Sequence, residues 1–168
     1  MKTNNKQPTA YIICGFIGAG KTTFAKKLEK QTGAFRITKD EWLIDLVGHD
    51  PKIEGFKKYN EKICRLSHKL ACEFIKRGID VILDEGFWAE QQRQDIREKM
   101  EKAGAKVILY YVNCPMALMW ERVVERNKNL TPDSFKISKQ MFYGYAKYWQ
   151  PPEVGEDYVL APVFNTES

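Results

Sequence analysis

The chain has 168 residues, of which 43% are hydrophobic, with a mean hydropathy of −0.49 and a net charge of +5. This length suits one domain with its own core, and no apolar run approaches the roughly 18 residues that a membrane-spanning helix needs. The 27 basic and 22 acidic residues are mixed along the chain, which favours small anionic ligands somewhat and argues against nucleic acid as a partner.

Residues 1–10 are polar and carry neither a signal peptide nor a lipid-anchor motif, so we expect a disordered tail and a cytoplasmic protein. Residues 11–168 show no internal repeat and no linker, which predicts one domain. The four cysteines form no CxxC pair, so we expect neither a disulfide nor a zinc site. We expect a monomer or a weak homodimer.

Runs rich in β-branched and aromatic residues predict five strands, the last of them short: 11–16, 34–38, 80–86, 106–113 and 158–162. The stretches between them predict six helices: 21–31, 41–47, 56–76, 89–103, 116–127 and roughly 135–149. Strands that alternate with helices pair in parallel through right-handed crossovers. The chain therefore predicts a doubly wound α/β domain whose five-stranded parallel sheet is flanked by helices and whose first four strands are buried.

The stretch after the first predicted strand, GFIGAGKTT, has the spacing G-x-x-x-x-G-K-[ST]. Glycines in this pattern let backbone N–H groups point at phosphate oxygens, and the positive end of the following helix adds to them. A plain strand-to-helix turn is the alternative. We expect Lys21 to reach the β- and γ-phosphates and Thr22 to hold Mg²⁺. The residues predicted to bind the nucleotide are Gly15, Gly18, Ala19, Gly20, Lys21, Thr22 and Thr23.

Residues just after parallel strands share one edge of the sheet, which brings further side chains toward this loop. Asp84 ends the apolar run VILD, where a carboxylate is costly unless it supports a metal or accepts the Thr22 hydroxyl. The alternative is a cap for the next helix. Because successive strand residues face opposite sides, Asp84 and Glu85 cannot both point at one metal, and Glu85 is the weaker candidate.

Asp40 follows the second predicted strand in the segment TKDEW. A carboxylate there can accept the proton of an attacking hydroxyl or align that hydroxyl for phosphoryl transfer. It can equally be the N-cap of the next helix, and spacing alone does not decide between the two.

Arg122 and Arg126 lie four residues apart, so they share one face of a helix that precedes a polar stretch. Guanidinium groups there can close over a transferred phosphoryl group and stabilise its charge. Surface pairing with neighbouring acids is the alternative. We interpret the polar stretch, about 126–136, as a short lid.

Five segments together resemble a known family: GFIGAGKTT, ITKDEW, VILDEGFWAEQQRQDIR, NCPMALMWERVVERN and YWQPPEVGEDY. They are similar to the small P-loop kinases called AAA-type predicted kinases, a group related to chloramphenicol phosphotransferase, zeta toxins, gluconate kinase and the polynucleotide kinase domains. The segments span nearly the whole chain, and the DEGFW and ERN pieces are more specific than the loop.

The resemblance implies that Asp40 orients or deprotonates the acceptor, that Asp84 supports the metal, and that Arg126 acts with Arg122 from the lid. It also implies that Arg93 contacts phosphate or substrate, although a salt bridge on a helix surface is equally compatible. Family members often have glutamate where this chain has Gln150. By analogy the adenine lies near Pro162.

The residues and the resemblance together predict a phosphotransferase that uses ATP and Mg²⁺ and moves the γ-phosphate to a hydroxyl of a small molecule. One alternative is a kinase of nucleotides or of nucleic-acid 5′-hydroxyls, for which no basic, aromatic groove is identifiable in the sequence. Another is a nucleotide-binding regulatory NTPase without an acceptor.

Overall fold

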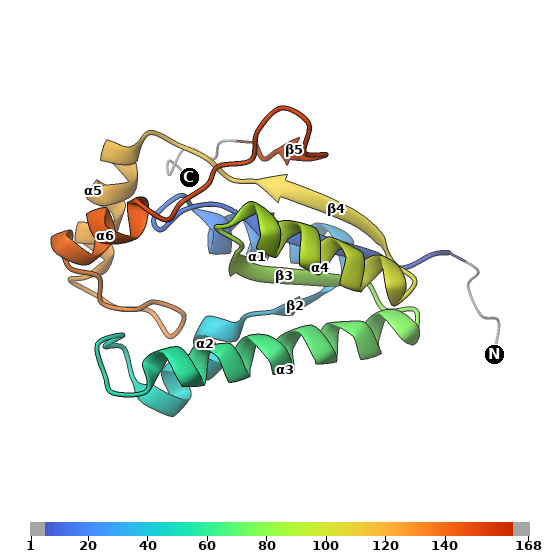
Figure 1. Cartoon of the computed structure of the whole chain (residues 1–168), viewed down its shortest axis with the longest axis horizontal. Helices are drawn as coiled ribbons and strands as arrows, with labels where there is room; N and C mark the ends of the chain where they lie inside the picture. The colour runs from blue at the N-terminus through green and yellow to red at the C-terminus, as the bar shows by residue number, and fades with distance from the viewer. Residues whose placement is uncertain (1–5, 163–168) are drawn as a thin grey trace.

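The computed structural model describes residues 6–162 of the chain. Its strands are β1 Thr9–Cys14, β2 Phe35–Ile37, β3 Val81–Gly86, β4 Lys106–Tyr111 and β5 Val159–Leu160. Its helices are α1 Lys21–Thr32, α2 Lys39–Val47, α3 Phe56–Lys76, α4 Glu90–Lys102, α5 Met116–Arg126 and α6 Lys139–Ala146. The strands form one parallel sheet in the order β2-β3-β1-β4-β5, which confirms the predicted doubly wound fold (Figure 1).

The helices cover both faces of the sheet, because successive residues of the central strand β1 point to opposite sides. Ile12 packs in a core with residues of α3 and α4, whereas Ile13 packs in a second core with residues of α1, α5 and α6. Figure 1 shows α4 in front of the sheet and α1 behind it. The carboxyl ends of the strands therefore open at one edge, between the two layers.

The first strand begins at Thr9, two residues before the predicted start. The Thr9 amide donates to the Asp80 carboxylate over 2.7 Å, and β1 pairs with β4 from this residue onward. Thr9 and Ala10 thus belong to the sheet and not to the predicted tail, of which residues 1–5 lie outside the described part.

The second strand is an edge strand, so the prediction that it is buried is wrong. Phe35 is 48% exposed. Arg36, next to it, places its guanidinium close to three carboxylates: those of Glu29 at 3.3 Å, Glu41 at 3.4 Å and Asp84 at 3.5 Å. The edge position of the strand and these nearby acids together account for an arginine in it.

The last helix is shorter than predicted, Lys139–Ala146 in place of about 135–149. The Ser138 hydroxyl accepts the Met141 amide, which fixes the start of the helix. No helix within residues 6–162 is long and apolar enough to cross a membrane.

Candidate active site

The loop between β1 and α1 fits closely against its neighbours at two glycines. A Cβ added to Gly15 would lie 2.5 Å from the Val112 carbonyl oxygen, and one added to Gly18, whose φ is 79°, would lie 2.4 Å from that of Met119. Only glycine therefore fits at either position. The first turn of α1 has no acidic residue and no side-chain cap, so its backbone N–H groups stay available for an anion.

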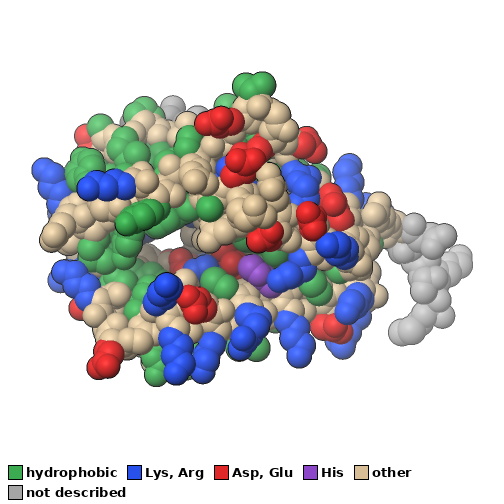
Figure 2. Space-filling model, in the orientation of Figure 1, with side chains coloured by type: hydrophobic (Ala, Val, Ile, Leu, Met, Phe, Trp, Pro, Cys, Tyr) green, Lys and Arg blue, Asp and Glu red, His purple; other side chains and the backbone are tan. Residues whose placement is uncertain are grey.

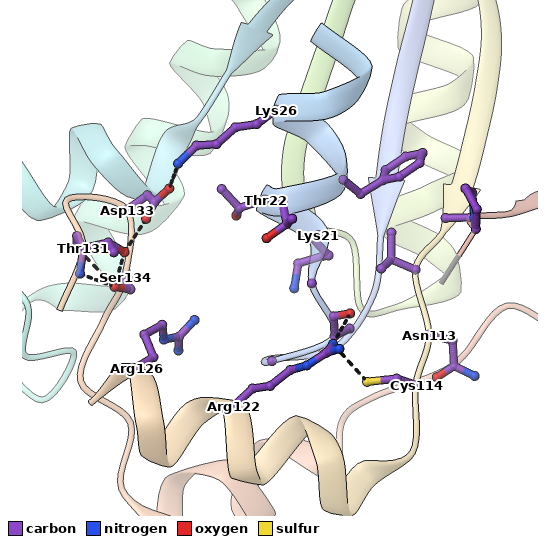
Figure 3. A pocket seen from close by; sticks show the side chains of 18 residues that line it. Lys21, Thr22, Lys26, Asn113, Cys114, Arg122, Arg126, Thr131, Asp133 and Ser134 are labelled. Carbon is purple, nitrogen blue, oxygen red and sulfur yellow. Dashed lines mark hydrogen bonds and ion pairs between the residues drawn. The ribbon is translucent and has the colours of Figure 1, made fainter. Parts of the chain in front are cut away.

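Lys21 begins α1 and turns back over the loop, where its ammonium donates to the Phe16 carbonyl oxygen over 2.8 Å. Burial lowers the pKa of Lys21, while Asp84 and Asp40 act in the opposite direction. The ammonium group thus lies near both acids that the sequence singled out. Figure 3 shows it pointing into an open hollow, beside Thr22.

Asp84 is buried at the end of β3, and its Oδ2 has no hydrogen-bond partner among the described residues. Burial raises the pKa of Asp84 to about 6, against the opposing effects of Lys21, Arg36 and a hydrogen bond from Thr22. The next helix, α4, has Ala89 at its N-cap, so Asp84 does not cap it. An unsatisfied carboxylate oxygen beside a threonine hydroxyl fits a cation such as Mg²⁺.

Glu85 points to the other side of β3, as the alternation along a strand requires. It accepts from the Ser67 hydroxyl over 2.7 Å and pairs with His68 Nε2 over 2.9 Å. The described residues contain no cluster of three or more His, Cys, Asp or Glu side chains that could hold a metal ion. A metal here would depend on phosphate oxygens and water for its other ligands.

Asp40 is not an N-cap, because Thr38 occupies that position of α2. Asp40 lies in the first turn of the helix, and its Oδ1 accepts from the Lys39 ammonium over 2.9 Å. The same ammonium donates to Asn60 Oδ1 over 3.0 Å. Although burial opposes it, the nearby Asp40 raises the pKa of Lys39, so the ammonium group of Lys39 stays charged.

Two cavities meet at the carboxyl edge of the sheet. The first, about 390 Å³, extends from the loop and α1 to Pro162, and the second, about 300 Å³, contains Asp40 and Asp84. They share Gly18, Lys21, Thr22, Arg126 and Asp133. Figure 2 shows a hollow on this side of the molecule with charged side chains at its floor. The geometry thus places two binding spaces on either side of one lysine and one arginine.

The sequence-predicted residues divide between these spaces. Gly18, Lys21 and Thr22 line both, whereas Ala19, Gly20 and Thr23 line only the first and Gly15 lines neither. Gly15 lies beneath the loop, where its amide donates to the Gly86 carbonyl oxygen over 3.0 Å.

The two predicted arginines project from α5 toward the first cavity (Figure 3). Arg122 donates to the Ala19 carbonyl oxygen over 3.3 Å and contacts Cys114 Sγ at 3.6 Å. Arg126 Nε is buried without a hydrogen-bond partner among the described residues, and burial lowers the pKa of Arg126. Neither arginine forms an ion pair with an acid of its own helix, which removes the surface-pairing alternative within residues 6–162.

The loop after α5 supplies site residues that the sequence analysis missed. Asp133 lines both cavities and accepts from the Lys26 ammonium of α1 over 2.9 Å (Figure 3). The loop is also joined to the segment after α2, since the Lys136 amide donates to the His49 carbonyl oxygen over 2.9 Å and His49 Nδ1 lies 2.8 Å from the Ser134 carbonyl oxygen. A lone Asp-Ser pair in a polar loop carries no signal from which these contacts could be predicted.

Arg93 lies away from both cavities. Its guanidinium, 2% exposed, forms a bidentate pair with Glu156 at 2.7 and 2.6 Å and donates to the Phe87, Trp88 and Gln150 carbonyl oxygens. It is neither a surface salt bridge nor a residue that faces the phosphate loop. Arg93 therefore links Glu156, in the segment before β5, to the turn at Phe87 and Trp88 that follows β3.

Comparisons with known proteins agree with the fold. A family profile described as an AAA domain matches residues 11–152. The L-seryl-tRNA(Sec) kinase of Methanococcus maripaludis is 23% identical over 152 residues, which cover 87% of this chain and 58% of that protein. The chain therefore spans little more than half the length of this curated relative.

Two solved structures are similar over most of the chain. The unliganded structure of a sugar kinase from Janibacter sp. HTCC2649 has a TM-score of 0.66 at 15% identity and covers 93% of this chain and 85% of that one. A gluconokinase from Sinorhizobium meliloti 1021 has a TM-score of 0.62 at 15% identity and covers 93% and 83%. At 15% identity these structures show a shared fold and nothing more. The family itself is shown by the profile, which matches residues 11–152 and so covers most of the chain. This protein belongs to the AAA-domain family of small P-loop kinases.

Proposed function

We propose that this protein transfers the γ-phosphate of ATP to a hydroxyl group of a small molecule, with Mg²⁺ as cofactor. The observation that carries the proposal is the junction of two cavities at Lys21 and Arg126, with Asp40 on the side away from the loop. A kinase needs this arrangement, because donor and acceptor must meet in line across the transferred group.

The nucleotide occupies the first cavity in this proposal. Backbone N–H groups of the loop and of the first turn of α1 hold the phosphates, and Lys21 spans the β- and γ-phosphates. Arg126, desolvated and without a partner at Nε, stabilises the charge of the transferred group, and Arg122 supports it from one helical turn away. The adenine lies toward Pro162, at the far end of the cavity.

The metal site consists of Thr22 and Asp84. The unsatisfied Asp84 Oδ2 and the Thr22 hydroxyl beside it are suited to hold Mg²⁺, directly or through water. When bound, Mg²⁺ neutralises developing negative charge on the phosphate oxygens. Arg36 Nη1 lies 3.5 Å from the same Asp84 Oδ2, beyond hydrogen-bond distance, and adds a positive charge beside the carboxylate.

The acceptor occupies the second cavity. Asp40 accepts the hydroxyl proton as the oxygen attacks phosphorus, and Lys39 holds the carboxylate in place through their 2.9 Å contact. The loop at about 126–136 acts as the lid that excludes water from the transfer.

A second candidate is a kinase that acts on a hydroxyl of a nucleic acid. It is favoured by a row of exposed cations, Lys58, Lys62, Arg65 and Lys69, at helical spacing on the outer face of α3 (Figure 2). None of the four pairs with an acid within residues 6–162. The relative that acts on seryl-tRNA points the same way.

An assay of ADP release with and without acceptors tests the proposal. The panel contains sugars, amino alcohols, aromatic alcohols and a 5′-hydroxyl oligonucleotide, each at saturating ATP and Mg²⁺. We expect release to rise with a small alcohol and labelled phosphate to appear on it. Steady hydrolysis that no acceptor accelerates would identify a regulatory NTPase instead.

A further inference from the structure

Two pairs of aromatic rings line the second cavity, and we call these four rings its apolar wall. Phe56, which begins α3, lies 5.3 Å from Phe135 of the loop after α5, measured between ring centroids. Trp88, after β3, lies 5.6 Å from Tyr145 of α6. Four separate segments therefore bring rings to one small space of about 300 Å³. Such a wall binds flat or apolar surface and offers little to a chain of hydroxyl groups.

The rest of the lining is polar, and two of its charged groups, those of Lys39 and Glu85, already have partners. The Lys39 ammonium donates to both Asp40 and Asn60, and the Glu85 carboxylate is paired with Ser67 and His68. Four carboxylates line the cavity, those of Asp40, Asp84, Glu85 and Asp133, against three lining cations, those of Lys21, Lys39 and Arg126. From outside the lining, Lys26 pairs with Asp133 and Arg36 with Asp84, which leaves Asp40 and Glu85 as the acids that an acceptor would meet.

No cation on this polar part of the lining is left over for an acceptor that carries its own negative charge. Lys21 and Arg126 face the shared end, where the polyphosphate of the proposed nucleotide needs them. Nearby acids raise the pKa of Lys39 in spite of its burial, which is the sign of a negative local potential. A carboxylate or phosphate bound here would lose its hydration and meet acids in exchange.

We propose that the acceptor is an alcohol with a flat apolar body, uncharged or positively charged, and with neither a carboxylate nor a phosphate near the reacting hydroxyl. Its oxygen forms a bond to the γ-phosphorus, the bond from that phosphorus to the bridging oxygen of ADP breaks, and the hydroxyl proton passes to Asp40. This inference rests on the proposed kinase function. It separates this chain from kinases whose acceptor is a sugar acid or a phosphorylated nucleoside.

A matched set of alcohols tests the charge preference. Phenylalaninol is cationic, 3-phenylpropane-1,2-diol is neutral, and 3-phenyllactate is anionic, while glycerol lacks the ring and gluconate lacks the ring and adds a charge. We would measure binding by calorimetry on the protein saturated with a non-hydrolysable ATP analogue and Mg²⁺, and phosphate transfer with ATP.

We expect the neutral and the cationic ring-bearing alcohols to have a Kd at least about tenfold lower than that of phenyllactate. We also expect the Kd of the diol to be at least about tenfold lower than that of glycerol. Tighter binding of phenyllactate or gluconate, preferential phosphorylation of a 5′-hydroxyl oligonucleotide, or failure of every ring-bearing alcohol to bind would overturn the inference.

A pair of variants at Phe56 sharpens the test, because this ring stands at the half-exposed start of α3. Phe56→Lys replaces aromatic surface by a cation and should move the preference about tenfold toward phenyllactate. Phe56→Leu keeps the wall apolar and should keep the original order. Tyr143→Ala removes an exposed ring outside the cavity and serves as the folding control. An unchanged preference in Phe56→Lys would contradict the assignment of this wall.

The failure of the inference can be told apart from the failure of the kinase function. If the protein binds ATP and phosphorylates an anionic alcohol, only the acceptor class is wrong. If no acceptor changes the fate of ATP, the proposed function fails with it.

Discussion

At Lys21, burial in the folded protein opposes the positive charge that the proposed phosphate contact requires. Burial disfavours its charge in the free protein, and its hydrogen bond goes to a carbonyl oxygen of its own loop. Lys21→Ala should therefore lower kcat/KM about 10²- to 10³-fold, with little change in melting temperature. Lys30→Ala, an exposed position on the same helix, is the control. Activity equal to the unmodified protein would show that the ammonium does not contact the transferred phosphate.

Asp40 is tested by a change that keeps its shape and removes its charge. In Asp40→Asn we expect kcat to fall at least about 10²-fold while the Kd for the ATP analogue stays within about twofold, because Asp40 lines the second cavity and not the one proposed for the nucleotide. Stopped-flow binding and labelled-phosphate transfer measure the two separately. Loss of nucleotide binding would instead assign Asp40 to the metal or to the fold.

The buried Asp84 carboxylate lowers the stability of the free protein, although the proposed metal site needs it. Its pKa, about 6 in the folded protein, lies above that of a free aspartate. The free energy of unfolding therefore decreases as the pH rises from about 4, where the unfolded chain loses this proton, to about 6. Asp84→Asn should stabilise the free protein at pH 7.5 by on the order of 1 to 3 kcal/mol, and the gain should vanish near pH 4.

Urea unfolding at pH 7.5 and near pH 4 measures the change in the free energy of unfolding of Asp84→Asn. In an activity assay, the same variant should lose Mg²⁺-dependent phosphate transfer. A variant that is less stable at pH 7.5 would mean that the pair with Arg36 outweighs the desolvation of the carboxylate.

Among the elements, the segment before β5 is tied to α4 by one largely buried ion pair, Arg93–Glu156. Glu156, hydrogen-bonded to Arg93, has a lowered pKa, so the pair contributes stability above the ordinary pKa of glutamate and loses it as the pH falls through the lowered value. Glu156→Gln leaves a buried guanidinium without its counter-charge and should destabilise the fold by about 3 kcal/mol at pH 7.

The matched control is Asp157→Asn. Asp157 is 94% exposed and lies 3.7 Å from Arg97, so its loss should be close to neutral. The difference between the two variants should shrink as the pH falls below about 4. Equal effects at pH 7 would contradict the view that burial makes the Arg93 pair strong.

Elements with strong periodicity were predictable with their bounds, and both edge strands were predicted as strands, but the exposure of the second strand was not. The apolar spacing in 56–76 predicted α3 with its observed bounds, and the fourth strand starts where the apolar run starts. The second strand looked buried because its residues are apolar around one arginine, but its position in the sheet depends on pairing that no local pattern encodes. Ser138 shortened α6 by capping, a signal visible in the sequence but weaker than the aromatic run around it.

In the molecule as a whole, the loop after α5 joins layers that the chain separates widely. Asp133 links it to α1, and His49 links it to the segment after α2. Asp133→Asn should raise the KM for ATP severalfold and speed amide exchange across residues 127–137, with a smaller effect on kcat.

The Lys26–Asp133 pair is half exposed on the lysine side, so the coupling energy in a Lys26→Met/Asp133→Asn cycle should be about 0.5 kcal/mol or less. Unchanged exchange in residues 127–137 would show that the loop does not depend on Asp133 for its position.

The sequence predicted which residues gather at the sheet edge, because the rule that parallel strands open at one end needs only strand positions. It could not predict how the space divides into two cavities, since that depends on where Phe135 and Asp133 of an irregular loop meet α3 and α1. Arg93 is a second example. Its place in the family motif implied a contact with phosphate or substrate, but in the structure its guanidinium binds Glu156, which lies 63 residues further along the chain.

Arg126 is one of two cations that line both cavities, and unlike Lys21 it has a buried nitrogen, Nε, without a hydrogen-bond partner among residues 6–162. A site of this kind attracts whatever oxyanion the solution supplies. Sulfate or inorganic phosphate in a buffer should therefore act as a counter-ion for the free protein, raise its melting temperature and compete with ATP. Affinities for ATP measured in such buffers would be apparent values that weaken as the salt concentration rises.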